Sequence, residues 1–259
     1  MKVAITGSNG FVGTHLKNEF QDFVVIGRSD SVDEIVEKLA GVEVVINLAG
    51  APILKKWDEE YKKILYSSRI QTTKKLVQAI NQSKVKHFIS TSAIGFYGDD
   101  FLSSVTKDWE AEALKCQKPT TILRFGIILG TDGGALKNML FAFKLGLGGV
   151  IGDGKMYMSW IDVVDLMQIY HYVIDNTLEG TFDAVSPNPV TNKKFTKALG
   201  SALYRPTLFP LPIFVLKILF GEGASVLSGS LEIYPKHLLD LGFEFKYPDI
   251  ESSLKHLLN

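Results

Sequence analysis

A glycine-rich turn near the start of the chain limits the folds that this sequence can adopt. GSNGFVG (residues 7–13) follows the β-rich run KVAIT and precedes a helical pattern, THLKNEF. Gly7 permits a tight turn, Gly10 lets the backbone approach a pyrophosphate, and Gly13 lets the helix pack on the sheet. The helix N-terminus then presents free N–H groups to the phosphates. The turn predicts a dinucleotide site formed by Gly7, Asn9, Gly10, Phe11, Val12 and Gly13.

Strand-like and helical patterns alternate after this turn. Apolar β-rich runs such as FVVIG, VEVVINLAG, KHFISTSAIG and TTILRFGIILG are separated by helical patterns, the longest over residues 58–82. Parallel strands need crossover helices between them, so the alternation predicts an α/β fold, a doubly wound parallel sheet of the Rossmann type.

The texture of the sequence changes twice after this region. Glycines cluster in LGTDGG, KLGLGGV and IGDGK, as is typical of loops around a site. From Pro187 onward proline is frequent and the strand–helix rhythm is lost. We therefore expect a dinucleotide-binding Rossmann domain over residues 1–186, with 131–162 contributing to a substrate cleft, and a small C-terminal α+β domain over 187–259.

Composition and charge exclude several classes of partner. The 28 basic and 28 acidic residues cancel, so no bulk field attracts nucleic acid or an anionic membrane. The single cysteine, Cys116, excludes an internal disulfide and suits a reducing compartment. The chain opens on a strand pattern rather than a signal peptide. We expect a cytoplasmic protein that binds a small molecule, with no metal, nucleic acid or membrane.

One apolar run, LFPLPIFVLKILF (residues 208–220), tests this expectation. It is too short to span a bilayer and contains two prolines and a lysine. A core-packed or domain-edge helix is the simplest interpretation. A surface for an apolar substrate or a partner subunit is the alternative, which leaves a homodimer open.

The end of the second predicted strand indicates which dinucleotide is bound. An NAD site usually carries an acidic residue there, whereas this strand ends in Gly27, Arg28 and Ser29, with Asp30 beyond the expected position. A guanidinium can pair with a 2′-phosphate, and the attraction is roughly 1 to 4 kcal/mol at about 4 Å. The alternative for Arg28 is a solvated surface residue. We predict NADP(H) over NAD(H).

The third predicted strand ends in small residues that suit the same ligand. Leu48, Ala49 and Gly50 let a dinucleotide run across the edge of the sheet at the topological switch point.

These motifs together resemble a known superfamily. The GxxGxxG turn, NLAG (47–50) and STSAIGFYG (90–98) are similar to the extended short-chain dehydrogenases/reductases. SSRIQTTKKLVQAI, IGDGKMYMSWIDVVDL and PKHLLDLGFEFKYPDI resemble the epimerase-like subfamily with a short C-terminal domain, within the NAD-dependent epimerase/dehydratase family. The resemblance implies an NADP-binding Rossmann domain. It also implies Arg69 as a second phosphate candidate, unless it is an exposed helix residue, and the backbone near Ile128 beside the nicotinamide.

The resemblance further implies a serine, a tyrosine and a lysine four residues after the tyrosine. Ser92 matches the serine, with Ser90 and Thr91 as alternatives close by, although a hydroxyl that only caps the strand end is also possible. With Trp109 and Glu110 as anchors, the tyrosine and lysine positions fall at Leu102 and Thr106. No tyrosine of the chain has a lysine four residues later.

Tyr97 is the best substitute phenol, because it follows Ser92 by five residues, just past the strand end. The alternative is an aromatic side chain packed under the site. Lys107 could supply positive charge, or could lie on a solvated helix face.

The sequence is consistent with two different functions. The first is an NADP-dependent oxidoreductase or epimerase-like enzyme for a small hydroxyl or carbonyl substrate, in which Ser92 hydrogen-bonds the substrate oxygen and Tyr97 or water supplies the proton. The second is a catalytically silent NADP(H)-binding regulator or scaffold. The serine strand and the glycine-rich loops favour the first, and the missing tyrosine–lysine pair favours the second.

Overall fold

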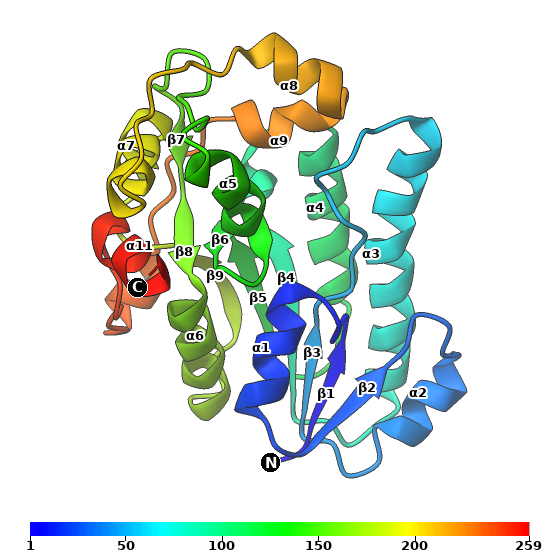
Figure 1. Ribbon diagram of the computed structural model, residues 1–259. Coiled ribbons are helices and arrows are strands. Elements are labelled where there is room, and N and C mark those ends of the chain that lie inside the picture. Colours follow the sequence, from blue (N-terminus) through cyan, green and yellow to red (C-terminus); the bar gives the residue numbers. More distant parts are fainter. Residues whose placement is uncertain (259) are drawn as a thin grey trace. The chain divides into compact units, whose positions relative to one another are not determined.

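A parallel sheet forms the centre of the nucleotide fold (Figure 1). The computed structural model describes residues 1–258. The sheet has six strands in the order β2-β1-β3-β4-β5-β9. They are β1 (Val3–Thr6), β2 (Phe23–Ile26), β3 (Val44–Asn47), β4 (His87–Ala93), β5 (Thr120–Phe125) and β9 (Gly180–Ala184). The pairs from β2 through β5 are all parallel, which confirms the predicted Rossmann architecture.

Helices connect these strands, as parallel pairing requires. They are α1 (Phe11–Glu19), α2 (Val32–Lys38), α3 (Glu59–Asn81), α4 (Phe101–Ala113) and α6 (Val163–Asp175), with a short 3-10 turn, η1 (Ile94–Tyr97), before α4. Side chains define two of the helix starts. Ser31 and Glu34 form a capping box at α2, and Asp100 accepts the Ser103 N–H at α4.

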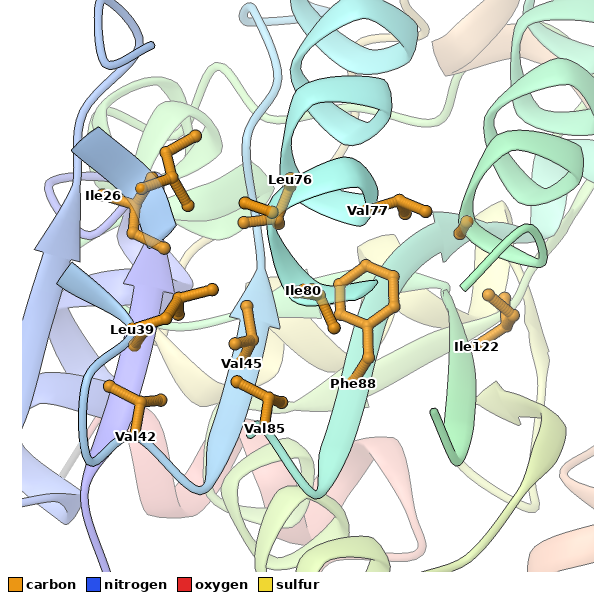
Figure 2. Packing of buried hydrophobic residues seen from close by; sticks show 14 residues of the cluster. Ile26, Leu39, Val42, Val45, Leu76, Val77, Ile80, Val85, Phe88 and Ile122 are labelled. Carbon is orange, nitrogen blue, oxygen red and sulfur yellow. The ribbon is translucent and has the colours of Figure 1, made fainter. Parts of the chain in front are cut away.

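Apolar side chains from α2, α3 and α4 bury one face of the sheet (Figure 2). Phe88 of β4 is fully buried among Leu76, Val77 and Ile80 of α3 and their neighbours. These apolar side chains of the longest helix therefore face the core. Truncating a buried phenylalanine of this kind to alanine typically costs about 3–5 kcal/mol. Glu19, the last residue of α1, and Phe20, which follows it, contact His171 of α6. The end of α1 therefore packs against α6.

Residue contacts divide the chain into two compact units. The first comprises Met1–Pro52, Glu60–Phe125 and Met167–Phe182, and the second Ile53–Glu59, Gly126–Leu166 and Asp183–Asn259. A compact unit need not fold as an independent domain, so the domain boundary after residue 186 stays a prediction.

The second unit contains two small sheets and several helices. Its strands are β6 (Ile127–Leu129), β7 (Tyr157–Met158), β8 (Trp160–Asp162) and β10 (Val190–Thr191), of which β6 pairs with β8 and β7 with β10. Its further helical elements are α5 (Gly134–Lys144), α7 (Asn192–Ala202), α8 (Ile213–Phe220), η2 (Glu222–Ala224), α9 (Ser225–Ser228), α10 (Lys236–Asp240) and α11 (Ile250–Leu258).

Two buried carboxylates tie the C-terminal segment to the start of α6. Asp162 accepts hydrogen bonds from the Val164 N–H (2.9 Å) and the Ser253 hydroxyl (2.7 Å). Asp165 accepts from the backbone N–H groups of residues 246 and 247. Burial raises the pKa of both carboxyl groups. Their backbone and hydroxyl partners indicate a structural role.

The second half of the apolar run, residues 213–220, forms α8, and only part of this helix is covered. Leu216 is buried, whereas Phe214 and Ile218 are 63% and 70% exposed. The predicted core-packed helix therefore buries one face and leaves another in solvent. Within residues 1–258, no helix combines the length and the apolar character that crossing a membrane requires.

Candidate active site

The glycine-rich turn has the geometry that a bound pyrophosphate needs. Gly7 has φ +64°, a conformation that favours glycine, and a Cβ there would lie 2.7 Å from the Leu48 carbonyl oxygen. A Cβ on Gly13 would lie 2.5 Å from the Gly7 carbonyl oxygen. The Gly10 N–H donates to Gly7 O (2.9 Å). Gly10 is the N-cap residue of α1, and no side chain caps the first turn of this helix. The backbone N–H groups of residues 11–13 therefore stay available to a ligand at this helix start.

Buried polar side chains hold the end of β3 beside this turn. Thr6 donates its hydroxyl to Asn47 Oδ1 (2.8 Å) and accepts the N–H groups of Leu48 (3.0 Å) and Ala49 (3.1 Å). Asn47 in turn donates to Thr73 of α3 (2.8 Å). The structure thus brings the predicted residues of the glycine turn and of the β3 end together.

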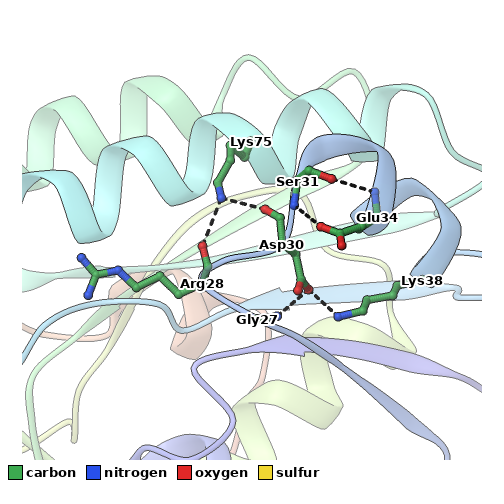
Figure 3. A network of polar contacts seen from close by, with 7 residues as sticks. All are labelled: Gly27, Arg28, Asp30, Ser31, Glu34, Lys38 and Lys75. Atoms are coloured by element: carbon green, nitrogen blue, oxygen red, sulfur yellow. Dashed lines mark hydrogen bonds and ion pairs between the residues drawn. The ribbon is translucent and has the colours of Figure 1, made fainter.

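The loop after β2 is held by two lysines from two helices (Figure 3). Asp30 Oδ2 accepts the Gly27 N–H (2.7 Å) and the Lys38 ammonium (2.5 Å). Lys75 donates to the carbonyl oxygens of Arg28 (3.1 Å) and Asp30 (2.7 Å). The Arg28 side chain is exposed and points away from this network, and Ser29 is exposed beside it.

Arg69 lies in a different environment from Arg28. It is 7% exposed and donates to the carbonyl oxygens of Leu65 and Ala51 (both 3.1 Å). Its guanidinium lies 5.3 Å from the Trp109 ring, and a Cβ on Gly50 would approach it to 3.0 Å. Burial lowers the pKa of Arg69 to about 10, so it is charged at neutral pH. These contacts favour a role in holding the chain after β3, and the phosphate role of Arg69 stays a prediction.

Ile128 belongs to the second unit, where it pairs with Ile161 of β8. Its place beside the nicotinamide stays a prediction.

The carboxyl end of β4 carries the predicted serine in a buried ion-pair network. Ser92 is 1% exposed and donates its hydroxyl to Glu110 Oε1 over 2.5 Å. Arg124, which stands beside Ser92 in the β4–β5 register, donates from Nε and Nη2 to both carboxylate oxygens of Glu110 (2.8 Å each). This is the bidentate geometry that gives strong, directional ion pairs.

The same guanidinium reaches the second predicted residue. Arg124 Nη1 donates to the phenol oxygen of Tyr97 over 2.8 Å, and the guanidinium lies 3.5 Å from the Phe96 ring centroid. Tyr97 is 45% exposed. Burial alone lowers the pKa of Arg124, but its contacts with Glu110 and Tyr97 outweigh burial and raise it. A permanent cation therefore stands beside a solvent-accessible phenol.

The helix position where the resembled superfamily has its lysine carries a different residue with different contacts here. Thr106, at the lysine position, is buried and donates to backbone carbonyl oxygens of its own helix, including that of Leu102 (2.9 Å). Lys107 donates to Gly98 O (3.3 Å) and lies 5.9 Å from the Phe96 ring. Lys107 therefore supports the loop before α4.

Sequence reasoning missed Glu110 and Arg124 as members of this site. In the sequence, Glu110 only marks the helix beside Trp109, and Arg124 lies inside the strand pattern TTILRFGIILG. A signal was present in the single charge within the apolar run TTILRF, since arginine is almost never buried unless it is paired.

Comparison with known proteins shows the family to which this chain belongs. The model of the NAD-dependent epimerase/dehydratase family matches residues 3–121, and a domain of unknown function (DUF1731) matches residues 211–257. The epimerase family protein SDR39U1 of Mus musculus is 32% identical over the full length of both chains. The chain belongs to the NAD-dependent epimerase/dehydratase family. The predicted family is thereby confirmed.

Further relatives of this family cover the whole chain. The chloroplastic SDR39U1 homologue of Arabidopsis thaliana is 34% identical over 100% of this chain and 87% of its own length. YfhF of Bacillus subtilis is 32% identical over 100% of this chain and 98% of its own length.

Solved structures give the same result. Human SDR39U1, crystallised with NADPH, has a TM-score of 0.91 and 29% identity and covers 100% of this chain and 99% of its own. A UDP-N-acetylglucosamine 4-epimerase from Bacillus cereus, at 14% identity and a TM-score of 0.78 over 99% of this chain and 98% of its own, shares the fold.

Proposed function

We propose that this member of the family is an NADP-dependent oxidoreductase or epimerase-like enzyme that acts on a small hydroxyl or carbonyl substrate. The observation that carries the proposal is the 2.8 Å hydrogen bond from Arg124 to the half-exposed phenol of Tyr97. A protein that only bound a dinucleotide would not need a fixed cation beside an accessible phenol.

The glycine turn supports NADP as the cofactor. Because Gly7 and Gly13 have no Cβ, the backbone of the turn can pack closely. The N–H groups at the start of α1 would then hold the pyrophosphate. The end of β3 would carry the ribose, and Arg28 would bind the 2′-phosphate. NADPH in the human SDR39U1 crystal structure supports the same choice. When bound, the nicotinamide would supply hydride transfer.

Tyr97 would donate or accept the proton at the substrate oxygen. In the resembled superfamily a lysine stabilises the phenolate, and here Arg124 would do so through its hydrogen bond to the phenol oxygen. Glu110 fixes the orientation of Arg124, and Ser92 fixes Glu110. The Ser92 proton is engaged by Glu110, so a direct bond from Ser92 to substrate would require its hydroxyl to turn.

One observation favours a second function, a catalytically silent NADP(H)-binding regulator or scaffold. Leu102 and Thr106 occupy the superfamily's tyrosine and lysine positions. A crystal structure with NADP⁺ separates the two proposals. If open space faces nicotinamide C4 beside Tyr97, the enzyme is supported; if side chains fill that space, the regulator is.

We also propose a cytoplasmic location and a homodimer. The free Cys116 suits a reducing compartment. The exposed Phe214 and Ile218 of α8 suit a partner subunit. Sedimentation velocity of the wild type and of Phe214→Asp tests the dimer, which the substitution should dissociate.

A further inference from the structure

The loop between β2 and α2 contains a carboxylate close to the strand end where NAD-preferring enzymes place one. Asp30 follows Ile26, the last residue of β2, by four positions. Its side chain turns back toward the strand, and Oδ2 accepts the Gly27 N–H over 2.7 Å. Asp30 therefore lies close to the region where the adenosine ribose would bind, although it is too late in the sequence to be read as the usual acidic residue.

Lys38 holds this carboxylate in place. It lies in the last turn of α2, and its ammonium is 2.5 Å from Asp30 Oδ2. The Asp30 side chain is 14% exposed, whereas that of Lys38 is 38% exposed. Burial raises the pKa of Asp30, but the bonds from Lys38 and from the Gly27 N–H outweigh burial and lower it. The carboxylate is therefore ionised and already neutralised by a neighbour.

Gly27 leaves the room that this arrangement needs. A Cβ at residue 27 would lie 2.9 Å from Asp30 Oδ1. Lys75 of α3 then fixes the backbone of the loop through the carbonyl oxygens of Arg28 and Asp30. The nearby carboxylate of Glu34 is engaged by the Ser31 N–H at the start of α2.

Arg28 is the cation that this arrangement leaves available. Its exposed guanidinium points away from the Asp30–Lys38 pair in Figure 3, and within residues 1–258 it makes no hydrogen bond or ion pair. The region therefore presents Arg28 to a ligand, while the carboxylate that accepts the Gly27 N–H is paired with Lys38.

We propose that Lys38 is a specificity-determining residue for the dinucleotide, because it holds Asp30 against Gly27 and keeps a free carboxylate away from the 2′-phosphate. The inference rests on the proposed NADP site and deepens it. Without Lys38, Asp30 becomes an unpaired carboxylate that repels a 2′-phosphate and can accept a hydrogen bond from the 2′-hydroxyl of NAD.

Calorimetric titration of NADP⁺ and NAD⁺ into purified full-length protein at low salt tests the proposal. For Lys38→Met we expect the ratio of the NAD⁺ to the NADP⁺ dissociation constant to fall about tenfold, because the substitution leaves the Asp30 carboxylate without its positive partner near the bound phosphate. Asp30→Asn in the Lys38→Met background should restore the ratio to within about twofold of the wild type. Lys38→Gln serves as a second variant.

Lys86→Met is the matched control. It breaks another surface ion pair, with Glu43 at 2.8 Å, and removes the same charge. If Lys38→Met and Lys38→Gln change the ratio no more than Lys86→Met does, the inference is overturned while the NADP site stands. If the wild type binds NAD⁺ more tightly than NADP⁺, or binds neither, the proposed cofactor itself is wrong.

Discussion

Arg124 donates from Nη1 to the phenol oxygen of Tyr97 over 2.8 Å while its other nitrogens hold Glu110. This single side chain joins a buried ion pair to an exposed aromatic group. In water, side-chain entropy would keep an arginine from holding one orientation. Here Glu110 and the Phe96 ring remove that freedom before any substrate binds. The site therefore has a preorganised positive charge, which is the arrangement that general acid–base catalysis by a phenol requires.

Removing one partner of the Arg124–Glu110 pair should lower the free energy of unfolding much more than neutralising both partners. We expect Arg124→Met to lower the free energy of unfolding by about 3–5 kcal/mol, because it leaves a buried carboxylate unpaired. Adding Glu110→Gln should recover most of that loss. Urea denaturation of the wild type and of the two variants measures both effects. The surface pair Lys115–Glu112, at 2.6 Å, is the control and should contribute no more than about 1 kcal/mol. Equal effects of the two pairs would contradict the buried, cooperative network.

Ser92→Ala distinguishes a positioning serine from one that binds the substrate oxygen. Because Arg124 still holds Glu110, we expect kcat/KM to fall less than about tenfold and the free energy of unfolding to fall by about 1.5–3 kcal/mol. Ser90→Ala, which removes only a 3.4 Å contact from Asn47, should change both quantities less. A loss of about a hundredfold in kcat/KM with unchanged stability would show that Ser92 contacts the reacting oxygen.

Gly13→Ala tests the cofactor turn. The new methyl group would lie 2.5 Å from the Gly7 carbonyl oxygen, so the turn must shift. We expect NADP(H) affinity to fall at least about tenfold and the free energy of unfolding to fall by roughly 1–3 kcal/mol. Gly95→Ala is the control, because a Cβ there meets no atom within 4 Å. NADP(H) titration and thermal melting measure the two effects, and unchanged affinity for Gly13→Ala would place the dinucleotide elsewhere.

His87 should make stability depend on pH. Burial lowers the pKa of its imidazole below the ordinary 6.5. The Thr121 hydroxyl donates to the Leu178 carbonyl oxygen, so His87 Nε2 carries a proton and donates to Thr121 Oγ1 (2.7 Å). The unfolded chain then binds a second proton at a higher pH than the folded one does. The contribution of His87 to the free energy of unfolding is fully present above about pH 6.5. It is lost as the pH falls through the folded-state pKa.

Melting temperatures between about pH 7.5 and 5.5, above the range where most carboxylates titrate, measure this effect. We expect His87→Gln to have a shallower slope than the wild type, by at most about 1.4 kcal/mol per pH unit in the free energy of unfolding. Parallel profiles for the two proteins would contradict the buried, neutral histidine.

Local patterns predicted the fold and the glycine turn because each depends on residues close in the chain. The alternation of strands and helices, and the spacing of Gly7, Gly10 and Gly13, are of this kind. The Asp30–Lys38 contact joins residues only eight positions apart, yet the sequence did not predict it. It depends on how the loop returns to β2, and no periodicity encodes that path.

The network of Ser92, Glu110, Arg124 and Tyr97 shows the same limit more clearly. Arg124 meets Tyr97 only because the register of β4 and β5 places it beside Ser92, 32 positions earlier in the chain. Local sequence could indicate that a charge inside the run TTILRF needs a partner, but it could not identify Glu110 as that partner. Leu102 and Thr106, at the positions where the resembled superfamily has its tyrosine and lysine, lie on α4, whereas Arg124, which we propose as the replacement cation, lies on β5.

Turnover by the wild type and by Tyr97→Phe tests the central claim most directly. Both proteins would be assayed against a panel of small hydroxyl and carbonyl compounds, with the absorbance of NADPH as the readout and Tyr66→Phe, which alters another partly exposed phenol, as the control. We expect at least one compound to be turned over by the wild type and by Tyr66→Phe, and kcat/KM for it to fall by about 10²–10⁴ in Tyr97→Phe. Undiminished turnover by Tyr97→Phe, or a panel on which the wild type binds NADPH and consumes nothing, would contradict the account.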